Sequence, residues 1–223
     1  MYKVVLATRN KNKIREFGEL LRGLSDKIEI LSLDDIGYEG DIEEDGATYE
    51  ENSVIKSSVP ASLGYIGVAD DSGLSVDVLD GAPGIFSARY AGEHVTYTDN
   101  NEKLLAVMKG ESRRGARFVC VMSLTIPDEL GIAVPDDLVN AELSRFAALR
   151  CGRAVTVVTL RGECFGTILD ECRGEGGFGY DPLFYYEPYG KTFAEMTQEE
   201  KGSVSHRGAA VRLLTEAADR IFK

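Results

Sequence analysis

The sequence predicts an α/β protein whose mixed central sheet is flanked by helices. Short apolar segments typical of buried strands alternate along the chain with stretches in which apolar residues recur at helical spacing. No internal repeat, low-complexity tract or Ser/Gly-rich linker divides the 223 residues. We therefore expect one domain over residues 1–223, large enough to bury a sizeable core.

The first quarter of the chain reads as strand, helix and strand, over residues 3–7, 11–22 and 27–31. Gly23 follows the helix, as glycine often does just past a helix end. The next helix begins after Thr48, because Thr48-x-x-Glu51 is a capping-box pattern, and runs towards residue 63. Pro60 lies inside it and is expected to kink or shorten it.

The remaining elements follow the same logic. A strand over residues 65–69 is expected to end at Asp70-Asp71-Ser72-Gly73, Thr98 to cap a helix that stops at Gly110, and Ser205 to cap the last helix. Further strands are predicted over residues 117–126, 154–160 and 163–169. The last two are expected to be joined by a tight hairpin at Arg161-Gly162.

Composition excludes several classes of function. A net charge of −12 and a pI near 4.7 argue against duplex nucleic acid or an anionic membrane as a partner. No apolar run approaches the ~20 residues that cross a bilayer, and no leader pattern is present, so a cytoplasmic protein is expected. The four cysteines form no C-x-x-C pair, so neither a zinc site nor a disulfide framework is expected.

The first candidate site lies between the first strand and first helix, at Thr8-Arg9-Asn10-Lys11-Asn12-Lys13. A helix N-terminus presents free N–H groups and a positive dipole end, which suit phosphate. A capped helix with surface lysines is the alternative, and for this segment alone it is the simpler interpretation.

Acidic residues form the second and third candidates. In Asp70-Asp71-Ser72 the adjacent carboxylates point in different directions on an extended chain, and one can hold Mg²⁺, which prefers oxygen ligands. A carboxylate from residues 41–46 can complete that site if the two segments lie close together. An Asp-rich turn and ordinary partners of a helix dipole are the alternatives.

Two late segments complete the set. Residues 174–182 combine many glycines with Phe178 and Tyr180, which favours a loop close to a ligand and a ring that stacks on a base, although a flexible glycine loop has the same composition. His206 and Arg207, with Lys201 nearby, can bind a purine edge or a phosphate. A helix cap or surface position is the alternative for His206.

Taken together, these segments resemble the inosine triphosphate pyrophosphatase (Ham1-like) family. The matching pieces occur in the same order along almost the whole chain: residues 8–13, Glu51-Asn52 with Lys56, residues 70–74, 81–90 and 176–182, and Ser205-His206-Arg207. The resemblance implies an elongated fold of two lobes with a substrate cleft between them, usually in a homodimer. It also implies Mg²⁺-dependent cleavage of non-standard purine nucleotides such as ITP, dITP and XTP to the monophosphate and pyrophosphate.

The resemblance also implies roles for single residues. Asp71 would be the general base and a magnesium ligand, Glu43 the second metal carboxylate with Glu44 as a close rival, and Ser72 a substrate contact. The triphosphate would be gripped by Thr8, Arg9, Asn10, Lys11, Asn12 and Lys13. The nucleotide would also be bound by Phe178, Gly179, Tyr180, Asp181, Lys201, His206 and Arg207.

The sequence departs from the family pattern in one segment, and two alternative functions remain. Residues 127–153, with a helical stretch at 139–149, are longer than the family's usual hairpin connection here. They touch no motif, so they are expected to alter the periphery or dimer contacts and not the chemistry. The alternatives are a Maf-like pyrophosphatase acting on pyrimidine or modified nucleotides, and a module that senses nucleotides without cutting them.

Overall fold

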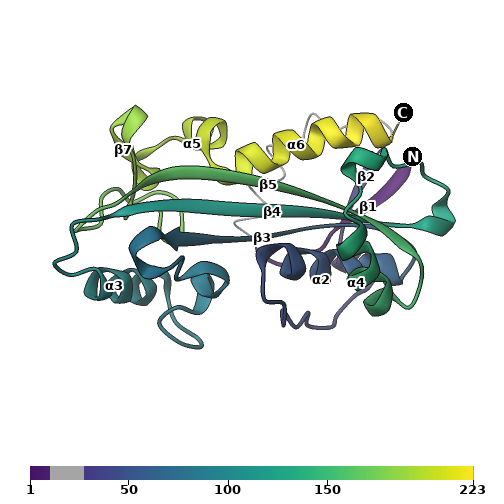
Figure 1. Ribbon diagram of the computed structural model, residues 1–223, viewed down its shortest axis with the longest axis horizontal. Coiled ribbons are helices and arrows are strands. Elements are labelled where there is room, and N and C mark those ends of the chain that lie inside the picture. Colours follow the sequence, from purple (N-terminus) through teal and green to yellow (C-terminus); the bar gives the residue numbers. More distant parts are fainter. Residues whose placement is uncertain (11–27, 223) are drawn as a thin grey trace. The chain divides into compact units, whose positions relative to one another are not determined.

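The computed structural model describes residues 1–10 and 28–222 (Figure 1). Seven strands form one sheet in the order β2-β1-β3-β4-β5-β6-β7. The strands are β1 (Tyr2–Leu6), β2 (Ile28–Ser32), β3 (Ile66–Val76), β4 (Gly115–Pro127), β5 (Val155–Ile168), β6 (Phe184–Tyr186) and β7 (Lys191–Thr192). The helices are α2 (Tyr49–Ser62), α3 (Tyr97–Val107), α4 (Ala141–Cys151), α5 (Gln198–Val204) and α6 (His206–Ile221).

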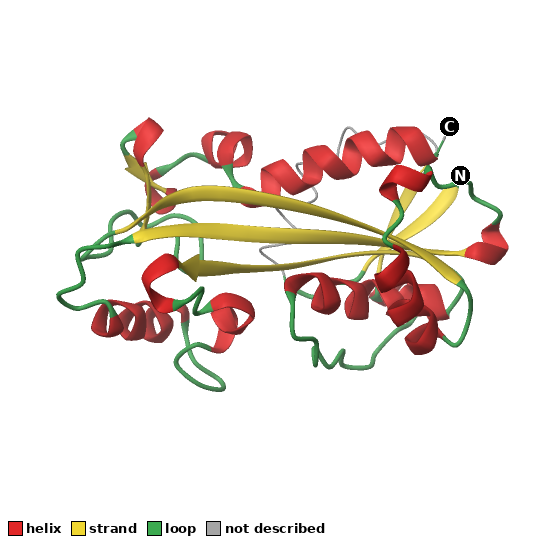
Figure 2. Ribbon diagram, in the orientation of Figure 1, coloured by secondary structure: helices red, strands yellow, loops and turns green. Residues whose placement is uncertain are grey.

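The sheet is mixed, as predicted. β1 pairs in parallel with β2 and β3, whereas β6 pairs antiparallel with β5 and β7. Helices accompany the strands along the chain (Figure 2), so the predicted α/β class is confirmed. The helix predicted over residues 11–22 lies outside the described residues. Within the described residues, no helix is both long enough and apolar enough to cross a membrane.

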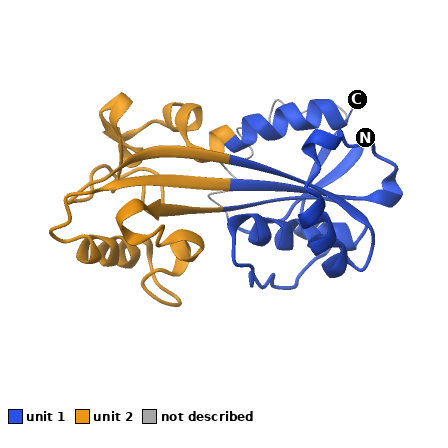
Figure 3. Ribbon diagram, in the orientation of Figure 1, with its two compact units in different colours: residues 1–71, 121–161, 210–223 blue, residues 72–120, 162–209 orange. Residues whose placement is uncertain are grey.

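The chain divides into two compact units (Figure 3). Unit 1 comprises residues 1–71, 121–161 and 210–223, and unit 2 comprises residues 72–120 and 162–209. In unit 1, α2 and α4 lie on one side of the strands and α6 on the other (Figure 1). The predicted single domain with a cleft between two lobes stays a prediction.

Helix α2 lies unusually close to the sheet in unit 1. A Cβ added at Gly67 of β3 would lie 1.9 Å from the carbonyl oxygen of Ser57, so only glycine permits this approach. Three buried hydroxyl contacts then join α2 to β4: Ser123 Oγ lies 2.8 Å from the Oγ atoms of both Ser53 and Ser57, and Ser57 Oγ lies 2.7 Å from Thr125 Oγ1. This packing places Lys56, the neighbour of Ser57, beside β3.

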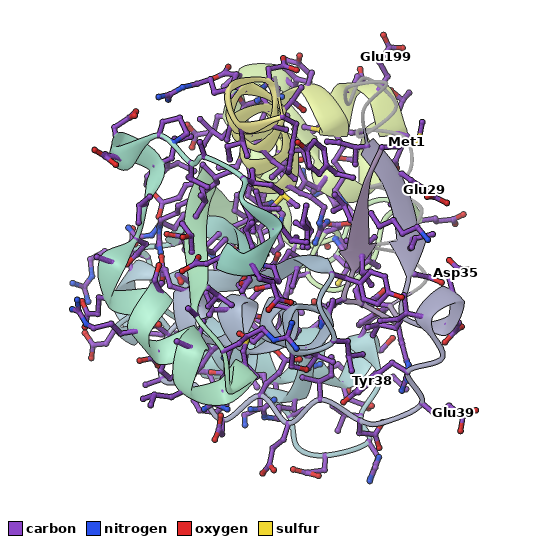
Figure 4. The ribbon with its side chains drawn as sticks, turned by 90° about the vertical axis from the view of Figure 1, so that its right-hand side faces the viewer. Met1, Glu29, Asp35, Tyr38, Glu39 and Glu199 are labelled. Atoms are coloured by element: carbon purple, nitrogen blue, oxygen red, sulfur yellow. The ribbon has the colours of Figure 1, made fainter. Side chains whose placement is uncertain are left out.

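The end of the sheet in unit 1 carries exposed acidic side chains. β2 is an edge strand, at one end of the strand order, and Glu29 on it points away from the ribbon, as do Asp35 and Glu39 nearby (Figure 4). Charged side chains on an edge strand disfavour pairing with a second sheet.

Two strand predictions were wrong in the same direction, because both strands are longer than expected. β3 does not end at Asp70 but continues to Val76, so the twin aspartates lie within a strand. β5 runs unbroken from Val155 to Ile168, so there is no hairpin at Arg161-Gly162. The tight hairpin turn requires positive φ, and Gly162 is not among the described residues that have it.

Two helix predictions also need correction. Pro60 does not shorten α2, which continues to Ser62, and the Pro60 carbonyl accepts hydrogen bonds from Leu63 N and Tyr65 N just beyond the helix. α3 is capped by Thr96 and not by Thr98, through a complete capping box with Asp99. The caps predicted at Thr48 and Ser205 are confirmed, with Oγ1 of Thr48 accepting from Glu51 N and Oγ of Ser205 from Gly208 N.

Candidate active site

In unit 1, carboxylates surround the ammonium group of one buried lysine. Lys56 Nζ lies 2.6 Å from Glu44 Oε2 and 3.2 Å from Asp71 Oδ1. Asp70, the neighbour of Asp71 on β3, contributes to the same electrostatic environment. We call Lys56, Glu44, Asp70 and Asp71 the Lys56 cluster. Glu44 of residues 41–46 thus lies near Asp71, which meets the condition for a carboxylate of that stretch to join Asp71 at a metal site.

Electrostatics keep Lys56 charged although it is buried. Burial opposes the charge and is the largest single influence on the pKa of Lys56. The negative charges of Asp71, Asp70 and Glu44 together outweigh it, so the pKa of Lys56 lies above its ordinary value. The ammonium in turn stabilises the negative charge of Asp71.

The two glutamates of residues 41–46, which we call the acidic stretch, have different surroundings. Glu44 is half-buried and paired with Lys56, whereas Glu43 is exposed. Among the described residues, no three His, Cys, Asp or Glu side chains are placed to hold a metal together. The oxygen donors fit Mg²⁺ in kind, because that ion is commonly held by one or two carboxylates and completes its shell with waters and substrate phosphates.

The turn after β1 contacts the segment that leads to the acidic stretch. Arg9 Nη2 donates to the Tyr38 carbonyl at 2.7 Å, and Nη1 lies 3.6 Å from Asp41 Oδ1. Thr8 Oγ1 accepts from Asn10 N at 3.2 Å, which shapes the turn. Lys11, Asn12 and Lys13 of this predicted phosphate site lie outside the described residues.

In unit 2, the glycine-rich segment forms a loop built around a buried carboxylate. Asp181 is 2% exposed, and its Oδ2 accepts hydrogen bonds from Phe178 N at 2.8 Å and from Lys201 Nζ at 2.7 Å. Gly177 has φ of +71°, and a Cβ added there would lie 2.1 Å from the same Oδ2. Glycine is thus required at position 177 for this carboxylate to occupy its place.

Cations from two helices surround the ring of Phe178. Lys201 Nζ lies 4.8 Å and Arg207 Cζ 5.5 Å from the ring centroid. His206 packs flat on Phe118, with centroids 4.7 Å apart and an interplanar angle of 13°. Phe178, Asp181, Lys201 and Arg207 form what we call the Phe178 cluster, so the predicted site residues of the two late segments do come together.

Two supporting residues, Ser87 and Asn101, were not singled out from the sequence. Ser87 accepts two hydrogen bonds: its Oγ accepts from Leu74 N, and its backbone carbonyl accepts from the Tyr180 hydroxyl at 2.9 Å. Asn101 of α3 donates to the Gly179 carbonyl at 3.0 Å and so holds the loop from the other side. Ser87 lies in residues 81–90, one of the matching segments, and that match was the sequence signal that could have identified it. No sequence pattern marked Asn101. Ser72 follows Asp71 on β3 and is half-buried.

Residues 127–153 contact α2 and residues 41–46, although these contacts fall on residues outside the matching segments. α4 packs on α2, where Leu143 and Ala147 meet Val54 and Ala61. Arg150 Nη2 also lies 2.7 Å from Asp45 Oδ1 in the acidic stretch. The expectation that residues 127–153 touch no motif stays a prediction, but α4 does support α2, the helix that carries Lys56.

The model of the Ham1 family matches residues 4–217 of this chain. The chain belongs to the Ham1 family. Curated relatives include proteins named dITP/XTP pyrophosphatase from several bacteria. The relative from Syntrophobacter fumaroxidans is 46% identical over 221 residues, which is 99% of this chain and 83% of the relative. The relative from Clostridium perfringens is 41% identical over 232 residues, and the match covers 100% of this chain and 100% of the relative.

Solved structures of Ham1 proteins share this fold. The HAM1 protein from Coxiella burnetii aligns with a TM-score of 0.80 at 35% identity, covering 99% of this chain and 100% of that one. The Ham1 protein of Staphylococcus aureus aligns with a TM-score of 0.79 at 35% identity, covering 98% of each chain. The resemblance inferred from the motifs is therefore confirmed.

Proposed function

We propose that this Ham1-family chain is a Mg²⁺-dependent pyrophosphohydrolase that converts dITP, ITP and XTP to the monophosphate and pyrophosphate. The observation that carries the proposal is the Lys56 cluster, in a chain whose full-length relatives are named dITP/XTP pyrophosphatases. Carboxylates beside a phosphate site serve hydrolysis better than mere binding, which argues against a nucleotide-sensing module. The relatives' names do not favour a Maf-like enzyme.

In the proposed reaction, water attacks the α-phosphorus and the bond from that phosphorus to the bridging oxygen breaks, releasing pyrophosphate. Asp71 accepts the proton from the attacking water. Lys56 helps by keeping the Asp71 carboxylate charged and oriented at 3.2 Å. The residues proposed to hold Mg²⁺ are Asp71 and Glu43; when bound, the ion neutralises charge on the phosphate oxygens.

The contacts of Glu44 explain why Glu43 is our choice for the metal. Lys56 Nζ lies closer to Glu44, at 2.6 Å, than to Asp71, at 3.2 Å, so Glu44 is the more tightly paired carboxylate, whereas the exposed Glu43 is accessible to a metal that arrives with the nucleotide. On this assignment Glu43→Gln raises the Mg²⁺ concentration needed for half-maximal activity. Glu44→Gln instead lowers stability, because it removes a partner of buried Lys56. The reverse pattern would assign the metal to Glu44.

Base selection is proposed to lie in unit 2. Phe178 would stack on the purine, and donors such as His206 and Arg207 would bind the 6-oxo group, where adenine presents a donor instead. A mismatched adenine leaves buried polar groups without partners, which discriminates strongly. Residues 8–13, Ser72, Gly179, Tyr180, Asp181 and Lys201 would provide the remaining substrate contacts. A homodimer and a cytoplasmic location remain part of the proposal.

Pyrophosphate release from dITP, ITP, XTP, dATP and dUTP, with Mg²⁺ and with a chelator, tests the function. We expect release from the first three only, and only with Mg²⁺. Equal rates on dATP and dITP would refute the base assignment, and orthophosphate as the product would refute the reaction.

Asp71→Asn tests the proposed base. Loss of a positioned general base typically lowers turnover by about 10²–10⁴-fold, while dITP binding stays measurable by calorimetry. Asp80→Asn is the matched control, because Asp80 is exposed and has φ of +52°, which asparagine tolerates. Near-full activity in Asp71→Asn would exclude Asp71 as the base.

A further inference from the structure

We infer that Arg150 of α4 is a positioning residue for the proposed metal site, acting through Asp45 on the acidic stretch that carries Glu43 and Glu44. The inference rests on the proposed function and extends it to a segment, residues 127–153, that carries none of the matching motifs. It is built from contacts within unit 1 alone.

The first step is that α4 is firmly held on β5. Asn140 caps the helix, its Oδ1 accepting from Leu143 N at 3.1 Å and its backbone N–H donating to the Val157 carbonyl at 2.8 Å. Ser144 Oγ accepts from Val157 N at 2.9 Å, and Gly152 ends the helix in the left-handed conformation. Arg150 therefore projects from a helix fixed at both ends.

The second step is that α4 also packs on the helix that carries Lys56. Leu143 and Ala147 form one apolar cluster with the fully buried Val54 and Ala61 of α2. Near its end, α4 places Cys151 Sγ 3.4 Å from the Ser58 carbonyl. Interiors packed this tightly transmit small displacements, so α4 and α2 behave as one support.

The third step is the contact with the acidic stretch. The Arg150 guanidinium packs over Phe146 of its own helix, 4.7 Å from the ring centroid, and Nη2 lies 2.7 Å from Asp45 Oδ1. Asp45 follows directly after Glu44, whose carboxylate is bound to Lys56. Arg150 thus holds the stretch at the residue directly after the Glu44–Lys56 pair.

Further restraints on the later part of this stretch come from α2. Gly46 N donates to Asn52 Oδ1 at 2.9 Å, and Ala47 N donates to Glu51 Oε2 at 2.6 Å. Together with the Glu44–Lys56 pair, they restrain residues 44, 46 and 47, and Arg150 restrains residue 45. Removing the Arg150 contact is expected to loosen the carboxylates and leave the rest of unit 1 intact.

The expected effect is modest because the pair is partly exposed. The side chains of Arg150 and Asp45 are 35% and 55% exposed, and such pairs change an equilibrium by up to about fivefold. We expect Arg150→Met to weaken Mn²⁺ binding, measured by electron paramagnetic resonance, about two- to fivefold. The Mg²⁺ concentration for half-maximal pyrophosphate release from dITP should rise by the same factor, with kcat at saturating Mg²⁺ unchanged.

Arg153→Met is the matched control. Arg153 lies in the same segment and pairs with Glu129 at 2.6 Å, but neither residue contacts the acidic stretch in any described interaction. Hydrogen exchange should accelerate in residues 41–47 of Arg150→Met and not of Arg153→Met. Adding Asp45→Asn to Arg150→Met should have no further effect, and Arg150→Lys should restore part of the binding.

Equal Mn²⁺ affinity in Arg150→Met and Arg153→Met would overturn the inference, as would faster exchange spread over the whole of unit 1. A thermal unfolding curve for each variant verifies that it is folded. If the unchanged protein released no pyrophosphate from dITP, the proposed function would fail. Mn²⁺ affinity and hydrogen exchange would still decide the role of Arg150.

Discussion

Replacing Gly177 by alanine tests how the Phe178 cluster is built. The backbone at Gly177 has φ of +71°, and the new Cβ would lie 2.1 Å from Asp181 Oδ2 and 2.8 Å from its Cγ. The carboxylate would have to move away from Phe178 N and Lys201 Nζ, which it binds at 2.8 and 2.7 Å. The perturbation therefore strains the backbone and also breaks contacts of a buried charge.

The matched control is Gly179→Ala in the same loop. Gly179 has φ of +65°, but nothing lies within 4 Å of an added Cβ, so this variant carries the backbone strain alone, about 1 kcal/mol. Loosening charge-assisted hydrogen bonds costs roughly 1.5–3 kcal/mol more in Gly177→Ala. We expect the free energy of unfolding to fall by about 3 kcal/mol in Gly177→Ala and about 1 kcal/mol in Gly179→Ala.

Urea denaturation of the two variants and the unchanged protein, under identical conditions, measures the difference. The Michaelis constant for dITP should also rise in Gly177→Ala, since Asp181 and Lys201 are proposed substrate contacts. Equal destabilisation of the two variants would refute the reasoning, because it would mean that the clash with Asp181 is relieved without cost.

Three further predictions follow from local contacts. Lys56→Met leaves buried carboxylates without their cation and should lower the free energy of unfolding by about 3 kcal/mol. Because folding raises the pKa of Lys56, the stabilisation by its charge should be complete below pH 10.5 and disappear as the pH rises through the folded pKa. Urea midpoints measured from pH 7 to 11 would reveal this loss. Thr96→Ala should cost about 1 kcal/mol by denaturation and Thr98→Ala much less, since Thr96 and not Thr98 caps α3; equal losses would contradict the assigned cap. Burial raises the pKa of the Cys164 thiol to about 12, so a disulfide reagent at pH 8 should label exposed Cys172 first and Cys164 only after unfolding; early labelling of Cys164 would contradict its burial.

Local signals carried much of the fold. The caps at Thr48 and Ser205 depend on side chains that form hydrogen bonds with backbone N–H groups only a few residues away, so a short stretch of sequence predicts them. The ends of strands β3 and β5 could not be predicted from the sequence, because neighbouring strands keep polar or glycine residues such as Asp70 and Gly162 in extended conformation. Local propensity is weaker than strand pairing in the middle of a sheet.

The sequence by itself determined the α/β class, the family and the residue types of the site, because each is written in short ordered patterns. Only the tertiary structure decided which carboxylate meets Lys56, why position 177 is glycine, and that α4 supports the acidic stretch. These are contacts between residues as distant as Asp45 and Arg150. They depend on how helices and strands pack, and spacing along the chain does not encode that packing.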